Sequence, residues 1–172
     1  HMSTHLSFIY VKSQTDTMID PSGPSIIGAL FHSIMFAYQK SISKRFSKAA
    51  SVAIDRNISE FLDPVFEMDE LKEVLEQDTP EKAINKFSTF LKSQHLVEDI
   101  LFTPKHKGYI FEVKECLFSG KAHGLFDEED VACPYGLVAH YIVEKVTGRK
   151  TGHSLTKFKE RDSITHIDDL SE

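Results

Sequence analysis

The feature that most constrains the fold is a change of sequence character near residue 96. Up to about residue 94, apolar residues recur at spacings of three and four, which is typical of amphipathic helices. Beyond it, residues 96–103 (LVEDILFT) and 109–118 (YIFEVKECLF) are rich in β-branched and aromatic residues and flank the connection PKHKG. Two such segments around a short glycine-containing connection predict a β-hairpin.

The rest of the chain fits the same division. An apolar stripe predicts a long helix over about residues 25–47. Thr79-Pro80 predicts a helix start, with a capping hydroxyl before a proline at the first helical position. Pro134 predicts the start of a later helix that runs to Thr147, with Gly148 as its C-terminal stop. Residues 153–169 have the pattern of a closing hairpin. The sequence therefore predicts the α+β class, with N-terminal helices packed on an antiparallel sheet of four to five strands.

Composition limits the kind of protein this is. The chain has 172 residues and a formal net charge of -6, which argues against a nucleic-acid-binding domain. No apolar run reaches the roughly 20 residues of a membrane span. We expect residues 1–24 to form an N-terminal arm, with residues 1–2 a cloning remnant, and residues 25–172 to form a single domain. Two cysteines without a visible secretory signal predict a reducing, cytoplasmic location.

Both cysteines belong to the pattern Cys116-x6-His123-x9-Cys133-x6-His140, which suggests a zinc site. His140 is excluded, because seven residues along a helix separate it from Cys133 by about 10 Å. Zinc ligands bind at only about 2.0 to 2.3 Å. Cys116, His123 and Cys133 remain as candidate ligands, with a carboxylate of residues 127–130 or Glu115 as the fourth.

Two other interpretations of the cysteines stay open. Free cysteines often pack as small apolar groups in a core. Alternatively, Cys133 is a nucleophile with His123 or His140 as its base. A position at a helix N-terminus would lower the pKa of the Cys133 thiol and favour thiolate. Strict alternation along the preceding strand would place Cys116 on the face that Glu112 and Lys114 share.

The chain contains 13 phenylalanines, enough to fill a core or to line an apolar cavity. The candidate pocket residues, with His32 or His140 as polar contacts, are Phe31, Met35, Tyr38, Phe87, Tyr141 and His140. Plain core packing is the alternative for the apolar and aromatic residues, and a surface position is the alternative for the two histidines. Nucleotide-binding loops and the common hydrolase motifs are absent from the sequence, so enzymatic activity is the less favoured interpretation.

The order of elements resembles a known family. A helical half ending in NISEFL is followed by VKECLF, then by CPYGLVAHYIVEKVTGRK and by the hairpin SLTKFKERDSITHIDDL. This arrangement is similar to the 4-vinyl reductase domain family, especially its small archaeal stand-alone members, described as predicted hydrocarbon-binding proteins. That family shares its fold with the Bet-type subunits of the TRAPP vesicle-tethering complex. The late Cys-x-Phe ending of many members is missing here.

The resemblance implies an α/β-plait that forms a homodimer, for which the first helix is the expected seam. It also implies a small hydrophobic or aromatic ligand between helices and sheet. A structural zinc near the pocket is a further implication, and Cys116 and Cys133 match its cysteine ligands by position. The alternative that the resemblance leaves open is a TRAPP-like interaction scaffold without ligand chemistry.

Overall fold

The computed structural model describes residues 26–46, 58, 60–119, 123, 131–153 and 156–171, excluding the side chains of residues 26–29, 43–46 and 153. Residues 60–66 are helical. The other elements, in chain order, are α1 (Ile26–Phe46), α3 (Asp69–Leu75), α4 (Pro80–Ser93), β1 (Val97–Lys105), β2 (Gly108–Cys116), α5 (Pro134–Thr147), β3 (Thr151–His153), β4 (Lys157–Lys159) and β5 (Asp162–Asp169).

The five strands form one antiparallel sheet in the order β1-β2-β5-β3, with β4 also paired to β5. The predicted hairpin is confirmed, since β1 and β2 pair across the turn that joins Lys105 to Gly108. β4 and β5 make the closing hairpin. β3 pairs with the far end of β5, beside Ile167 to Asp169. The predicted α+β class, with helices ahead of an antiparallel sheet, is therefore confirmed.

Local signals in the sequence place the helix ends. The Thr79 hydroxyl accepts a hydrogen bond from the N–H of Lys82, and Pro80 occupies the first helical position of α4. α5 begins directly after Cys133 and ends at Gly148, whose φ of 66° is left-handed. Both boundaries of α5 agree with the prediction.

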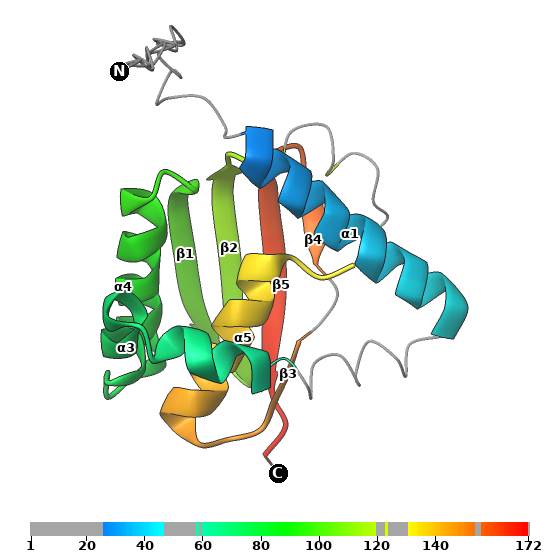
Figure 1. The fold of residues 1–172 in the computed structure, drawn as a ribbon. Coiled ribbons are helices and arrows are strands. Elements are labelled where there is room, and N and C mark those ends of the chain that lie inside the picture. The colour runs from blue at the N-terminus through cyan, green and yellow to red at the C-terminus, as the bar shows by residue number, and fades with distance from the viewer. Residues whose placement is uncertain are drawn as a thin grey trace, which may run out of the picture.

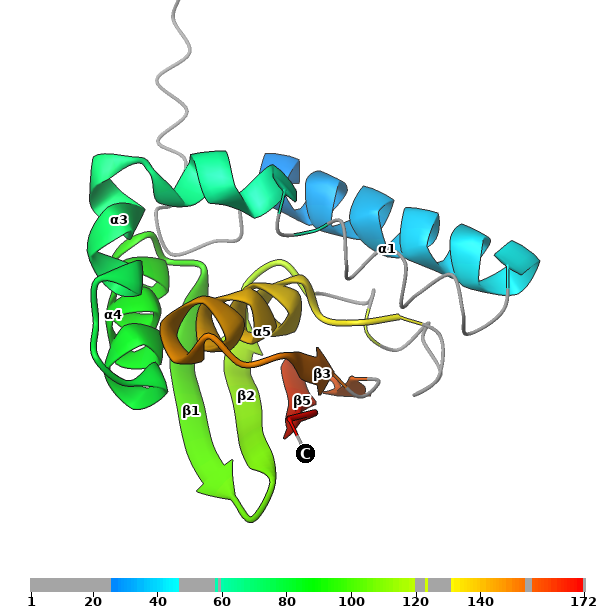
Figure 2. The same ribbon diagram turned by 90° about the horizontal axis from the view of Figure 1, so that it is seen from below.

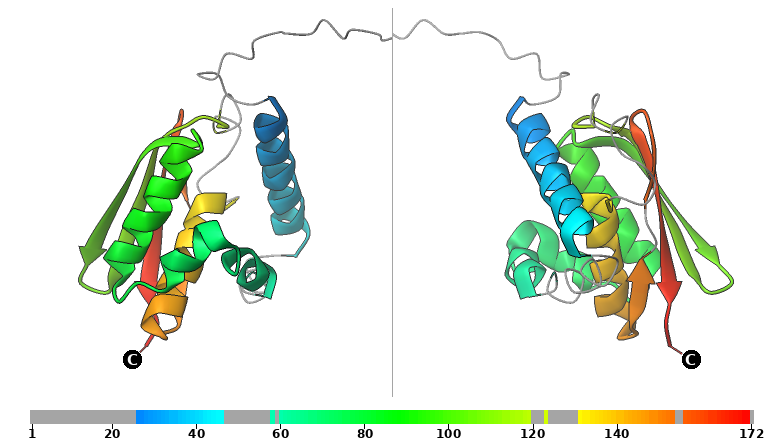
Figure 3. Two further views of the ribbon diagram at one scale, coloured as in Figure 1. Left: turned by 60° about the vertical axis from the view of Figure 1, so that its left-hand side comes forward. Right: turned by 90° about the vertical axis from the view of Figure 1, so that its right-hand side faces the viewer.

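The described helices all lie on one face of the sheet (Figures 1 and 3). α4 packs on β1 and against α3 and α5, while α5 lies over β2 and β5. Between these helices and the sheet lies the core, whose fully buried members include Ile84, Phe111 and Ile142. α1 lies further from the sheet than α5 and forms an outer layer (Figure 2).

One prediction about β2 is wrong. Lys114 keeps to the outward face, where its ammonium pairs with Glu112 and Asp162, but Cys116 is buried in the core cluster. The reason is Glu115, whose backbone is left-handed with a φ of 48° and breaks the alternation of the strand. The Cys116 side chain is therefore on the helix side of the sheet.

The predicted arm, residues 1–24, lies outside the described residues, so the domain boundary stays a prediction. Among the helices that the structure describes, none has the length and apolar character needed to cross a lipid bilayer.

Candidate functional site

Aromatic and histidine side chains gather beneath α1. We define the aromatic–histidine cluster as His32 and Phe36 of α1, Phe118 after β2, His123, Tyr135 in the first turn of α5, and Phe158 of β4. Its members come from segments far apart in the chain. They meet at the end of the sheet where β2 finishes and β4 pairs with the start of β5.

The cluster is held by ring contacts. Phe36 lies edge-on to His32, with 4.5 Å between centroids, and to Phe158, at 5.4 Å. His123 lies 4.7 Å from Phe158 and 6.0 Å from His32. Phe36 is fully buried, and His32 and His123 are only 6% and 3% exposed. α1 therefore contacts the body of the domain through aromatic rings.

Three ring nitrogens in the cluster have no hydrogen-bond partner among the described residues. They are Nε2 of His32 and both Nδ1 and Nε2 of His123. Burial, with a smaller repulsion from His123, lowers the pKa of His32 to about 4. Burial also lowers the pKa of His123 to about 4. Weaker opposing effects come from the backbone of Glu160 and Asp162, which lies near the ring without the geometry of a hydrogen bond, and from the Asp162 carboxylate. Both imidazoles are therefore neutral at pH 7, and each offers one donor and one acceptor nitrogen.

A hydrogen-bonded network fixes the start of α5 next to this cluster. The N–H of Cys133 donates to Thr156 Oγ1 at 2.9 Å, and that hydroxyl lies 2.8 Å from Thr165 Oγ1. Both threonines are buried on the strand side. One residue earlier, the N–H of Ala132 donates to Gln39 Oε1 at 2.9 Å, which ties α1 to the segment before α5.

The two thiols are buried near each other. Burial, with a smaller effect from the neighbouring Cys133, raises the pKa of Cys116 to about 11. Burial also raises the pKa of Cys133, although the Ser163 hydroxyl and the backbone N–H groups of Gly136 and Tyr135 act in the opposite direction. The expected thiolate at the helix N-terminus is therefore wrong. Desolvation outweighs the helix dipole here.

The thiol-enzyme interpretation requires a base in contact with the Cys133 thiol, and His123, the first candidate, does not make this contact. Neither nitrogen of His123 is hydrogen-bonded to the Cys133 thiol. The alternative base, His140, is buried on α5, with its Nε2 3.9 Å from Glu144 Oε1.

In the part of the chain that the structure describes, no three His, Cys, Asp or Glu side chains are grouped so that they could hold a metal ion. His123 faces Phe158 and Phe36. The acidic residues 127–130, candidates for the fourth ligand, lie outside the described residues. The zinc site at Cys116, His123 and Cys133 therefore stays a prediction.

The six predicted pocket residues are not brought to one place. Phe31, Met35 and Tyr38 lie on the outer side of α1, where they are 64%, 47% and 69% exposed. Phe87 and Tyr141 are core residues, and Tyr141 donates its hydroxyl hydrogen to Asp63 at 2.7 Å. His140 is buried on α5.

Two histidines that the sequence assigned to different sites are instead neighbours. His32 was a candidate for the pocket and His123 for the metal. Sequence reasoning missed the rings around them, Phe36, Phe118, Tyr135 and Phe158. Some signal existed, because Phe36 follows His32 by four residues on one helix face. Phe118 and Tyr135 each follow a cysteine by two residues.

Comparison with known proteins gave no match, whether against protein-family models, curated proteins or solved structures. The resemblance to the 4-vinyl reductase domain family therefore stays a prediction.

Proposed function

We propose that this domain binds a small apolar or aromatic molecule, and that the binding site is the aromatic–histidine cluster beneath α1. One observation carries the proposal, which is that ring nitrogens of His32 and His123, buried among aromatic rings, have no hydrogen-bond partner among the described residues. Leaving a buried polar group unpaired costs about 1–3 kcal/mol. A ligand with a hydroxyl or carbonyl group would remove that cost.

The cluster also suits the rest of such a ligand. Phe36 and Phe158, whose ring centroids lie 5.4 Å apart, both offer apolar ring surface next to His123. Ligand sites are mostly apolar and contain a few polar groups that fix orientation. We therefore expect an aromatic or aliphatic body with one neutral polar group.

The test combines native mass spectrometry with a designed variant. We expect the purified protein to carry a bound small molecule, or to take up a neutral fluorescent apolar probe such as Nile red. His32→Phe removes an unpaired polar atom, so it should keep or raise the melting temperature while weakening probe binding at least fivefold. Glu98→Phe, at an exposed position of β1, is the control. A stable His32→Phe protein that binds the probe as wild type does would refute the site.

The outer side of α1 supports a second proposal, that the domain forms a homodimer through this helix. Five large apolar side chains of α1 are exposed there: Leu30, Phe31, Ile34, Met35 and Tyr38. Apolar surface of this extent on one helix is typical of an interaction site. It also favours the alternative function, a scaffold subunit without ligand chemistry.

Light scattering measures the oligomeric state, and together with the ligand and probe measurements it separates these functions. Phe31→Asp with Tyr38→Asp should convert a dimer into a monomer, whereas Ser33→Asp, at another exposed position of α1, should not. A dimer that carries no ligand and binds no probe would favour the scaffold. A wild-type monomer at all accessible concentrations would contradict the homodimer.

We also propose a structural zinc at Cys116, His123 and Cys133, completed by an acidic residue of the following loop, and a cytoplasmic location. The buried free thiols support both, because thiols persist in reducing compartments and thiolates bind zinc. Metal analysis of the purified protein tests the first. A zinc content below about 0.1 per chain after expression with added zinc would contradict it.

A further inference from the structure

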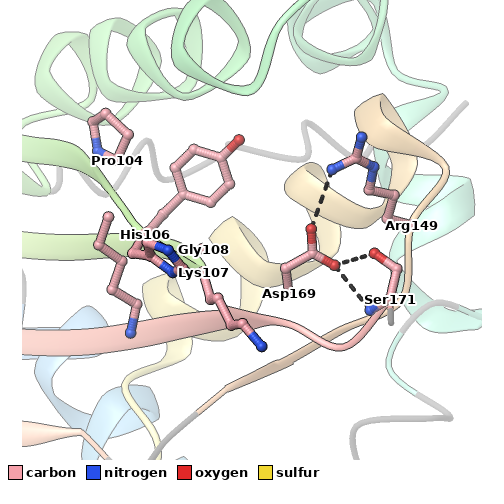
Figure 4. Close-up of a pocket in the computed structure, with 9 residues that line it drawn as sticks. Pro104, His106, Lys107, Gly108, Arg149, Asp169 and Ser171 are labelled. Atoms are coloured by element: carbon pink, nitrogen blue, oxygen red, sulfur yellow. Dashed lines mark hydrogen bonds and ion pairs between the residues drawn. The ribbon is translucent and has the colours of Figure 1, made fainter.

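A cavity lies at the opposite end of the sheet from α1. It has a volume of about 250 Å³ and opens where the turn between β1 and β2 meets the segment after α5 (Figure 4). Lys107, Tyr109, Arg149, Asp169 and Ser171 are among the residues that line it. None of them belongs to the aromatic–histidine cluster, so the inference below does not depend on the function proposed above.

Backbone geometry builds this cavity. Gly108 has a φ of 120°, and a Cβ there would lie 2.0 Å from the carbonyl oxygen of Ile167, so only glycine lets the turn approach β5 so closely. Gly148 ends α5 in a left-handed conformation and turns the chain into Arg149. The backbone conformations of Gly108 and Gly148 thus set the two turns that form the cavity.

Its walls carry more positive than negative charge. Lys105, Lys107 and Arg149 line the cavity, against the single carboxylate of Asp169. Lys105 is neutralised by Asp168, at 2.6 Å. Arg149 is paired with Asp169, at 3.2 Å. Lys107 is therefore the lining cation that has no ion pair among the described residues.

The donors in the cavity are only partly used. One terminal guanidinium nitrogen of Arg149 forms an ion pair with Asp169 Oδ2, at 3.2 Å, and the Arg149 side chain is 64% exposed. A guanidinium has five N–H donors in a planar fork, so further donors remain for a planar or tetrahedral oxyanion. Burial and nearby carboxylates, Glu81 first, raise the pKa of Tyr109, whose phenol therefore stays a neutral donor near pH 7. Ser171, whose hydroxyl is bound to Asp169, closes this side (Figure 4).

We propose that this cavity binds a small molecule through a phosphate or carboxylate group, with Arg149 and Lys107 supplying charge and the Tyr109 hydroxyl a hydrogen bond. Charge-assisted hydrogen bonds from arginine to an oxyanion are stronger than neutral ones. The Asp169 carboxylate holds the Arg149 fork over the cavity before the anion arrives. The volume accommodates an oxyanion together with a small body of a few more atoms.

An NMR titration of the full chain tests the proposal. Inorganic phosphate and, separately, acetate are added at constant ionic strength while backbone amide shifts are followed. We expect saturable shifts at residues 105–109 and 149–150 with at least one anion. Saturation by phosphate alone identifies a phosphate group as the ligand chemistry, and saturation by acetate alone a carboxylate.

Variants decide whether the site is specific. Arg149→Gln and Lys107→Gln should each weaken binding at least fivefold, while Lys72→Gln, on the exposed side of α3, should leave it unchanged. The same spectra report whether each variant is folded. Shifts that grow linearly without saturation, or equal affinity in the Arg149→Gln and Lys107→Gln double variant, would overturn the proposal.

Discussion

The imidazole ring of His32 on α1 lies 6.0 Å from that of His123, centroid to centroid, in a buried setting where both rings are neutral at pH 7. Protonating either ring places a positive charge beside the other without water to screen it. α1 is therefore joined to the domain through a contact that is sensitive to acid.

We first predict that stability falls as the pH is lowered from about 6.5 towards 4. The pKa of both histidines is about 4 in the folded state, below the usual value of 6.5. The unfolded state then binds more protons in this window, and acidification favours unfolding. The loss should be on the order of 2 kcal/mol per histidine, since one pKa unit corresponds to about 1.4 kcal/mol and partial solvation reduces the effect.

Urea denaturation at pH 7 and pH 5 measures this loss. Among the described residues, the carboxylate that acts on the pKa of His123 is that of Asp162, whose own lowered pKa keeps it ionised at both values. A His32→Gln, His123→Gln double variant should show a much smaller change between the two pH values. An unchanged pH dependence in that variant would mean that other groups cause it.

The sequence predicted most of the architecture because its signals are local. The Thr79–Pro80 start of α4 and the Gly148 stop of α5 depend on capping and backbone preferences within a few residues. The hairpin around PKHKG depends on alternation and turn chemistry alone. All three lie where the sequence placed them.

The site was harder to predict because it depends on contacts between distant segments. Helical spacing shows that Phe31 and Phe36 lie on different sides of α1, but not which side faces the sheet. The structure buries Phe36 and exposes Phe31. The helix has apolar residues on both sides, so periodicity could not decide. Likewise, one left-handed residue, Glu115, moved Cys116 to the other face of its strand.

A second prediction concerns the close approach of α5 to the sheet. A Cβ at Gly136 would lie 2.5 Å from Thr165 Oγ1, so Gly136→Ala forces the buried Thr165 to move. Overpacking of this kind costs about 1–3 kcal/mol, which thermal denaturation would detect. Gly152→Ala is the matched control, because the new methyl group would meet only the exposed side chain of Leu170, at 3.2 Å. Equal losses in the two variants would contradict the role of the Gly136 contact.

Thirdly, we predict that both thiols are slow to react in the native state. Cys116 and Cys133 are buried, and burial raises the pKa of each. The thiolate is the reactive form, so labelling by Ellman's reagent at pH 8 should be at least 100-fold slower in buffer than in denaturing urea. One thiol that reacts as fast in the folded protein as in the unfolded one would instead support the thiol-enzyme interpretation.

The last prediction separates two members of the threonine network. Thr156 accepts the Cys133 N–H hydrogen bond and also contacts the Thr165 hydroxyl. Thr156→Val leaves a buried N–H without its partner, which costs about 1–3 kcal/mol, whereas Thr165→Val removes one hydroxyl contact but keeps the bond to Cys133. We therefore expect Thr156→Val to be the more destabilising change in urea denaturation, with Thr103→Val, exposed on β1, close to neutral. If Thr165→Val were as damaging as Thr156→Val, the pair of hydroxyl groups, and not the hydrogen bond from the Cys133 N–H, would be the contact that matters.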